Sequence, residues 1–323
     1  MNHNIHVHHY TMHSRSALNA KSKRIEHQGA LIKVQGNVGT GYGCIHPWPE
    51  LGDANLEQTL TMLRQGELTP LSQRALYCAE VDAVARLDGR SLFDDLEVPR
   101  SHATLMMDED DLSAAVQAGF EIVKLKVGRD PATESGFIAE QAARYPQLRW
   151  RLDFNGVLDI PDVESFVAGL GMDVRARIDF LEDAYRVGTG QGVINALGPY
   201  DIPMAVDREV GSALGDFGFA LIKPAVNEPG PILDRARLEG KRVVFTSYMD
   251  HPLGQCFAAW EAAKALHAFP DVVDTCGLVT HGLFEPDAFT EALGPPRPDF
   301  QPPAGTGLGF DELLECLLWK PLS

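Results

Sequence analysis

The chain has 323 residues, 45% of them hydrophobic and 23% charged, so it can hold one barrel and a smaller partner domain. Its formal net charge of −17 argues against nucleic acid as a partner, since nucleic acid requires a basic surface. No run approaches 18 consecutive apolar residues, so no membrane span is expected.

The N-terminus and the cysteines favour a cytoplasmic protein. The first 25 residues lack the apolar stretch and the cleavage site of a secretory signal. Five scattered cysteines, never in a C-x-x-C pair, suit buried thiols in a reducing compartment and show no zinc motif.

The N-terminal region, residues 1–98, predicts an α+β domain. Alternation of His6, His8 and Tyr10 predicts a strand rather than a metal cluster, because no acidic or cysteine ligands accompany the histidines. The glycines between 39 and 43 predict a hairpin turn, because their spacing does not match a dinucleotide-binding fingerprint. Helical periodicity follows from about residue 54 to 88.

After Pro99, eight short apolar runs alternate with helical segments. The predicted strands are 103–107, 122–127, 150–154, 178–181, 204–206, 220–222, 243–246 and 277–279. Eight such units predict a closed (β/α) barrel over residues 99–284. The tail, 285–323, is rich in Pro and Gly, ends in a short helix (311–319), and is expected to return to the N-terminal domain.

The carboxyl ends of barrel strands usually carry the active site. Strands two to six end in a cation, three acids and a cation: Lys124 and Lys126, Asp153 and Asn155, Glu182 and Asp183, Asp207, and Lys223. Taken singly, each is weak evidence, because lysines line solvated edges and carboxylates cap helices. Their order is stronger evidence. Like charges repel, so three carboxylates gathered at one end indicate a bound cation.

Mg²⁺ is the cation that this pattern favours. Three carboxylates with water or substrate oxygens suit its octahedral shell. These strand ends carry no histidine or cysteine, which argues against zinc. The metal would neutralise a substrate carboxylate, so that a proton can leave the neighbouring carbon. Lys126 or Lys223 is the expected base, since a nearby ammonium and a dication lower the pKa of a lysine.

These motifs resemble those of the enolase superfamily, muconate-lactonizing-enzyme subgroup. Within it, the segments RLDFNG, VVFTSYMDHPLGQ and GTGLGFDELLE are similar to those of the o-succinylbenzoate synthases of menaquinone biosynthesis. The resemblance covers nearly the whole chain. It implies an α/β fold with a modified (β/α)7β barrel and an α+β capping domain, which is built from the N-terminal region and the C-terminal tail.

The resemblance also implies a role for each site residue. Asp153, Glu182 and Asp207 are expected to bind Mg²⁺, for which Mn²⁺ could substitute, and Lys126 to remove the proton and then expel hydroxide as water. Lys223 is expected to stabilise the enediolate, while Lys124, Arg151 and Asn155 support the site. Ser247 is expected near the succinyl carboxylate. The partner is a small anionic carboxylate, and both a monomer and a homo-oligomer remain open.

Some features depart from the family pattern. Glu209 is an alternative to Asp207 as a metal ligand, and the 16 positions from Asp207 to Lys223 are short for a full βα unit. Asp250 and His251 replace an expected Glu and Ser.

Other functions remain open. N-succinylamino-acid racemase and other racemases or cycloisomerases of the superfamily use the same five residues. A dipeptide epimerase is disfavoured, since DTCGLVTHG lacks Asp-x-Asp. A Schiff-base aldolase that uses Lys223 leaves the acids unexplained, and a non-catalytic barrel leaves the whole set unexplained.

Overall fold

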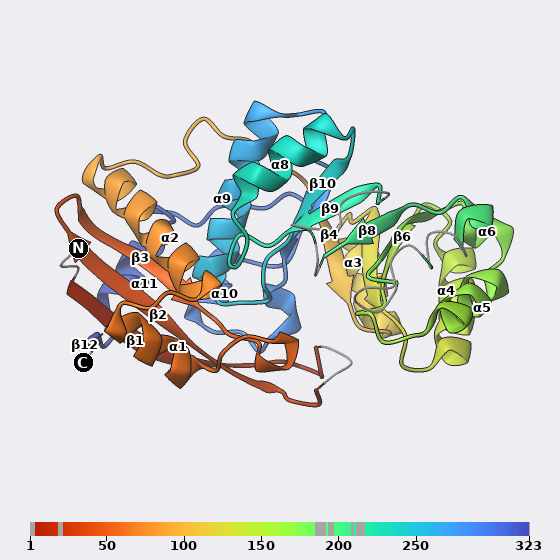
Figure 1. The fold of residues 1–323 in the computed structure, drawn as a ribbon, viewed down its shortest axis with the longest axis horizontal. Helices are drawn as coiled ribbons and strands as arrows, with labels where there is room; N and C mark the ends of the chain where they lie inside the picture. The colour runs from red at the N-terminus through yellow and green to blue at the C-terminus, as the bar shows by residue number, and fades with distance from the viewer. Residues whose placement is uncertain are drawn as a thin grey trace.

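The computed structural model describes residues 4–18, 22–184, 192, 197–207, 210 and 217–322. It contains two sheets, one of four strands and one of eight. In Figure 1 the four-stranded sheet lies at one end of the molecule, where both termini also lie, and helices α4, α5 and α6 lie at the other.

The four-stranded antiparallel sheet joins the two ends of the chain. Its order is β12-β1-β2-β3, and its strands are β1 (Asn4–His13), β2 (Glu26–Gly36), β3 (Gly39–Ile45) and β12 (Lys320–Pro321). Because β12 pairs with β1, the C-terminal end of the chain joins the sheet that holds the N-terminal strands. The predicted helix of the tail is shorter than expected, since α11 spans only Asp311–Glu315.

Two helices follow this sheet, α1 (Leu56–Gln65) and α2 (Pro70–Leu87). The side chain of Asn55 caps α1 and that of Thr69 caps α2, each in a reciprocal capping box. Pro70 occupies the first turn of α2, where its missing N–H costs no helical hydrogen bond. Local sequence therefore sets where both helices begin.

The interpretation of the glycines as turn residues was wrong for Gly41 and Gly43. Both lie inside β3, against α2. A Cβ added to Gly41 would lie 1.9 Å from the carbonyl oxygen of Ala79, and one added to Gly43 would lie 2.2 Å from that of Ala75. These glycines therefore allow close packing of the helix on the strand.

The second sheet is the predicted barrel. Its order, β10-β9-β8-β7-β6-β5-β4-β11, follows the chain except at β11, and its strand pairs are parallel. A bridge between Thr246 and Gly277 brings the two outer strands together. The strands are β4 (Ser101–Leu105), β5 (Ile122–Lys126), β6 (Arg149–Asp153), β7 (Ile178–Glu182), β8 (Met204–Val206), β9 (Phe219–Ile222), β10 (Arg242–Phe245) and β11 (Cys276–Val279).

The remaining α-helices in the described part of the chain are α3 (Glu109–Gln117), α4 (Pro131–Arg144), α5 (Ile160–Gly169), α6 (Met172–Arg175), α8 (Pro229–Leu238), α9 (Pro252–Ala268) and α10 (Ala288–Leu293). Short 3-10 helices span Pro49–Leu51, Gly198–Tyr200 and His281–Leu283. None of the described helices is both long and apolar enough to cross a membrane. Most of the segment between β8 and β9, where a reduced fifth helix was expected, lies outside the described residues.

The antiparallel sheet and the barrel pack through α9 and α2. Helix α9 contacts β3 on one side and β10 and β11 on the other. From α2, the buried Arg74 donates through Nε to the carbonyl oxygen of Pro224 at 2.9 Å and pairs with Glu261 of α9 at 2.5 Å. Pro224 directly follows Lys223, so the cap contacts the barrel beside a predicted site residue.

Candidate active site

The register of the barrel brings the predicted residues to one end. Lys126 is the strand partner of Asp153, and Asp153 is the partner of Glu182. Asp207 directly follows β8 and Lys223 directly follows β9. Because all these strands are parallel, their carboxyl ends meet at one edge, and the five residues lie along it in chain order.

The residues two positions before Glu182, Asp207 and Lys223 form an apolar layer beneath the site. Alternate residues of a strand face the same side, so Phe180, Ala205 and Leu221 share a face with Glu182, Asp207 and Lys223. All three are fully buried and pack together with Val244. This layer keeps water from reaching the charged groups from below.

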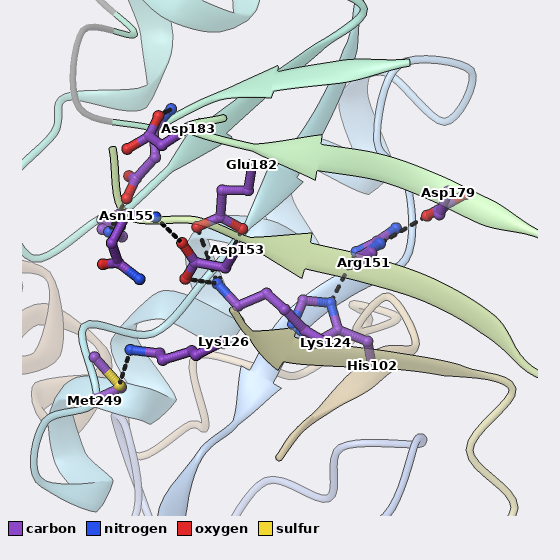
Figure 2. A network of polar contacts seen from close by, with 12 residues as sticks. His102, Lys124, Lys126, Arg151, Asp153, Asn155, Asp179, Glu182, Asp183 and Met249 are labelled. Carbon is purple, nitrogen blue, oxygen red and sulfur yellow. Dashed lines mark hydrogen bonds and ion pairs between the residues drawn. The ribbon is translucent and has the colours of Figure 1, made fainter. Parts of the chain in front are cut away.

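Lys124 lies between two of the predicted metal ligands (Figure 2). Its Nζ donates to both carboxylate oxygens of Glu182 at 2.9 Å and lies 3.2 Å from Oδ2 of Asp153. Burial lowers the pKa of Lys124, but Glu182 and Asp153 outweigh burial and raise it above its ordinary value. Lys124 is therefore a permanent cation that balances these acids.

Asp207 forms an ion pair with the ammonium of Lys223. The backbone N–H of Asp207 donates to Oδ1 of Asp183 at 3.0 Å, so the residue after Glu182 helps to place the end of β8. Burial lowers the pKa of Lys223, but Asp207 and then Glu182 raise it overall. Lys223 is accordingly a cation and a poor base.

Lys126 has a different environment. Its ammonium contacts Sδ of Met249 at 3.7 Å (Figure 2). It also donates to the carbonyl oxygen of Leu18, and it pairs with no carboxylate in the described part of the chain. Burial lowers its pKa to about 8, and Lys124 and Lys223 add to that effect, while Asp153 opposes it. The pKa falls as predicted, but the main cause is burial rather than the neighbouring ammonium groups.

The acids carry more negative charge than their surroundings balance. Burial and then Asp153 raise the pKa of Glu182 to about 8. Burial and then Asp207 raise the pKa of Asp183 to about 7. Burial also disfavours the charged form of Asp153, but Lys124, Lys126 and Lys223 together lower its pKa. The site therefore favours an added cation.

The donor set fits Mg²⁺ in kind, since carboxylate oxygens at adjacent strand ends are its preferred ligands. Lys124 and Lys223 now pair with these carboxylates. Among the described residues, no three His, Cys, Asp or Glu side chains are grouped as a metal site. Glu209, the alternative ligand, lies outside the described residues.

The predicted supporting residues occupy different places. Arg151 points away from the acids in Figure 2 and donates through Nε to Asp179 at 2.7 Å. Its guanidinium lies 4.6 Å from the ring centre of Phe180, within the layer beneath the site. The backbone N–H of Asn155 donates to Oδ1 of Asp153 at 3.0 Å, and the hydroxyl of Ser247 lies 2.6 Å from that of Thr280.

Three residues near the lysines were not singled out from the sequence. Leu18 and Met249 contact Lys126, and the ring of Tyr248 lies 5.8 Å from Nζ of Lys223. A usable signal was present for two of them, since Tyr248 and Met249 follow β10 closely, at the carboxyl end of the barrel. Leu18 acts through its backbone, which gives no residue-type signal.

Solved structures share this fold. A dipeptide epimerase from Enterococcus faecalis V583, complexed with Mg and the dipeptide L-Leu-L-Tyr, has a TM-score of 0.77 at 17% identity, covering 95% of this chain and 98% of that one. A mandelate racemase/muconate lactonizing protein from Herpetosiphon aurantiacus has a TM-score of 0.74 at 16% identity, covering 88% and 90%. The chain shares the fold of both proteins.

Sequence comparison identifies the protein family of this chain. Residues 5–85 match the family described as O-succinylbenzoate synthase, N-terminal domain. The o-succinylbenzoate synthase of Bdellovibrio bacteriovorus (strain HD100) is 32% identical over 323 residues, which cover 97% of each chain. The chain therefore belongs to the o-succinylbenzoate synthase family, and it is an enzyme of the lyase type.

Proposed function

We propose that this enzyme is a Mg²⁺-dependent dehydratase that converts SHCHC (2-succinyl-6-hydroxy-2,4-cyclohexadiene-1-carboxylate) to o-succinylbenzoate in menaquinone biosynthesis. The family relationship supports the substrate. A cytoplasmic location is part of the proposal. It is supported by five free cysteines, four of them buried, which suit a reducing compartment.

One observation supports this chemistry above all. The two lysines that flank the acids differ in how readily they lose a proton, because burial lowers the pKa of Lys126 to about 8 whereas Asp207 raises that of Lys223. At neutral pH one lysine can act as a base and the other remains a cation. Proton abstraction beside a carboxylate requires both roles.

Lys126 performs the two proton transfers. Its neutral amine takes the proton from the carbon beside the ring carboxylate, and the C–H electron pair moves toward that carboxylate. The resulting ammonium then gives the same proton to the leaving hydroxyl, the C–O bond breaks, and water departs. The electron pair completes the aromatic ring, so no oxidant or reductant is needed.

Lys223 stabilises the charge that develops on the substrate between these transfers. It is held by Asp207, with the ring of Tyr248 5.8 Å from its Nζ. A fixed cation in a buried site stabilises a developing anion more strongly than it would in water. The apolar layer of Phe180, Ala205 and Leu221 excludes water beneath it.

Asp153, Glu182 and Asp207 would hold the metal. When bound, Mg²⁺ would neutralise the substrate carboxylate and so lower the cost of removing the neighbouring proton. Lys124 balances the remaining charge of Asp153 and Glu182. We place Ser247, at the carboxyl end of β10, near the succinyl carboxylate.

A second candidate is N-succinylamino-acid racemase activity. The two lysines come from β5 and β9, on either side of the acidic strands β6 to β8, an arrangement that also suits proton transfer on two faces of a substrate. In such a reaction Lys223 would also exchange a proton. Its raised pKa favours the dehydratase.

The proposal is tested by turnover of SHCHC with purified, Mg²⁺-loaded enzyme, followed by loss of its ultraviolet absorbance. Turnover that is abolished in Lys126→Ala and by EDTA is the expected result. Normal turnover by Lys126→Ala contradicts the mechanism, and absence of turnover by the wild type contradicts the substrate. Exchange of the α-proton of an N-succinylamino acid with solvent tests the second candidate.

A further inference from the structure

Hydrogen bonds in both directions join a loop of the cap to a loop of the barrel. Nε1 of Trp48 donates to the carbonyl oxygen of Tyr248 at 2.8 Å, and the hydroxyl of Tyr248 donates to Oδ2 of Asp53 at 3.0 Å. The same oxygen of Asp53 accepts the backbone N–H of Trp48 at 2.8 Å. The three residues thus form a closed set of contacts between segments that are 195 to 200 positions apart.

These contacts are protected from water. Trp48 is fully buried, and Tyr248 is 8% exposed. Burial and then Asp53 raise the pKa of the Tyr248 hydroxyl, so it stays protonated and donates to the carboxylate. A hydrogen bond to a charged acceptor contributes more than an ordinary one, and its loss leaves Oδ2 of Asp53 with the backbone N–H of Trp48 alone.

The same tyrosine reaches the catalytic lysine. Its ring centre lies 5.8 Å from Nζ of Lys223, within the range of a cation–π contact. Tyr248 therefore contacts the cap loop at residues 46–53 through its hydroxyl and its carbonyl oxygen, and it contacts Lys223 through its ring. The ring contact and the hydroxyl contact can be removed separately, because phenylalanine keeps the first and loses the second.

We propose that Tyr248 is a positioning residue, which through Asp53 fastens the 46–53 loop over the active site and through its ring orients Lys223. The part that concerns Lys223 rests on the proposed function. Packing alone does not require the hydroxyl, since phenylalanine would fill the same space. Closure of the cap loop is needed to retain substrate, whereas orientation of Lys223 is needed for the chemical step.

The two contacts therefore predict different kinetic effects. In Tyr248→Phe we expect KM to rise about tenfold, equivalent to about 1.4 kcal/mol, with kcat within about twofold of the wild type. In Tyr248→Leu, which loses the ring as well, we expect kcat to fall about tenfold in addition. Asp53→Ala, which also removes the acceptor of the Trp48 backbone N–H, should raise KM at least as much as Tyr248→Phe, and the double variant should be no worse than Asp53→Ala alone.

Tyr145→Phe is the matched control, because Tyr145 follows α4, on the side of the barrel where the strands begin. It should leave both kinetic constants unchanged. Wild-type KM in Tyr248→Phe, or additive effects in the double variant, would overturn the fastening role. An unchanged kcat in a folded Tyr248→Leu variant, checked by circular dichroism, would overturn the orienting role.

Amide hydrogen exchange tests the contact without any substrate. Peptides covering residues 46–53 should exchange at least tenfold faster in Tyr248→Phe than in the wild type or Tyr145→Phe, and equal rates would overturn the fastening role. If the wild type does not turn over SHCHC, the proposed function fails, and the orienting role fails with it. The exchange rates still decide whether Tyr248 fastens the loop.

Discussion

Burial of Lys126 should set the pH dependence of the reaction. The ordinary pKa of 10.5 falls to about 8 in this site. At pH 7 a lysine with a pKa of about 8 is neutral in roughly one molecule in ten, against roughly one in 3,000 at the ordinary value. The buried environment thus supplies roughly 300-fold more of the reactive base.

We therefore expect kcat/KM to rise about tenfold per pH unit below about pH 8 and to level off above it. The group must lose its proton to act, so activity is lost as the pH falls through that pKa. Bound Mg²⁺ adds positive charge near Lys126, which lowers the pKa of its ammonium further. The rising limb of the pH profile then moves to lower pH. The assay is initial-rate turnover of SHCHC between pH 6 and 9.5 at saturating Mg²⁺.

A second variant tests the cause of the shift. Leu18 is 2% exposed and its carbonyl oxygen accepts from Lys126. Leu18→Ala keeps that oxygen but admits water, so the limb should move toward higher pH. Lys126→Arg should be inactive throughout, while Lys33→Arg, on the antiparallel sheet, should match the wild type. A limb near 10 in the wild type, or an unchanged limb in Leu18→Ala, would refute the assignment of Lys126 as the buried base.

Three further predictions concern the metal and the stability of the fold. Asp207→Asn should weaken Mg²⁺ binding at least tenfold by calorimetry, whereas Asp201→Asn, on a neighbouring loop, should leave it unchanged; equal affinities would contradict the ligand assignment. Burial raises the pKa of Asp250 from 3.8 to about 7, and its Oδ1 has no hydrogen-bond partner in the described part of the chain. Because the folded-state pKa is the higher one, this carboxyl contributes stability that is present below about pH 4 and lost as the pH rises through 7, so Asp250→Asn should stabilise the protein by about 2–4 kcal/mol at pH 8 and by little at pH 4 in urea unfolding. An equal effect at both pH values would contradict this reasoning. Arg74→Ala should destabilise by about 3–5 kcal/mol, because it removes the buried partner of Glu261 and leaves that carboxylate only the half-exposed Lys264. Arg90→Ala, at an exposed pair with Asp88, should cost less than about 1 kcal/mol. Similar losses would show that the Arg74 pair is not specially stabilising.

The barrel could be read from the sequence because its signal is local. Each strand is a short apolar run between helical segments, and all eight predicted runs overlap observed strands. The helix starts at Asn55 and Thr69 are also local, since a capping box involves residues three positions apart. The N-terminal glycines were misread because their role depends on α2, a partner that no local pattern identifies.

The site could be predicted only in outline. The residues at the strand ends follow from the alternation of strands and helices, since parallel strands must end at one edge. Their pairing does not follow from it. That Lys124 joins Asp153 to Glu182, while Lys126 has no carboxylate partner in the described part of the chain, depends on side-chain directions within the barrel. Arg151 was expected to support the metal site, but it lies one layer lower.

The sequence by itself determined the class of barrel, the order of charges along its strand ends and the resemblance to a family, because these depend on residue type and spacing along the chain. The tertiary structure decided how the two lysines differ. Burial lowers the pKa of Lys126, whereas Asp207 keeps Lys223 charged. It also brought Asp53 and Tyr248 together across 195 positions. Desolvation and ion pairing act through space, so only the folded chain shows them.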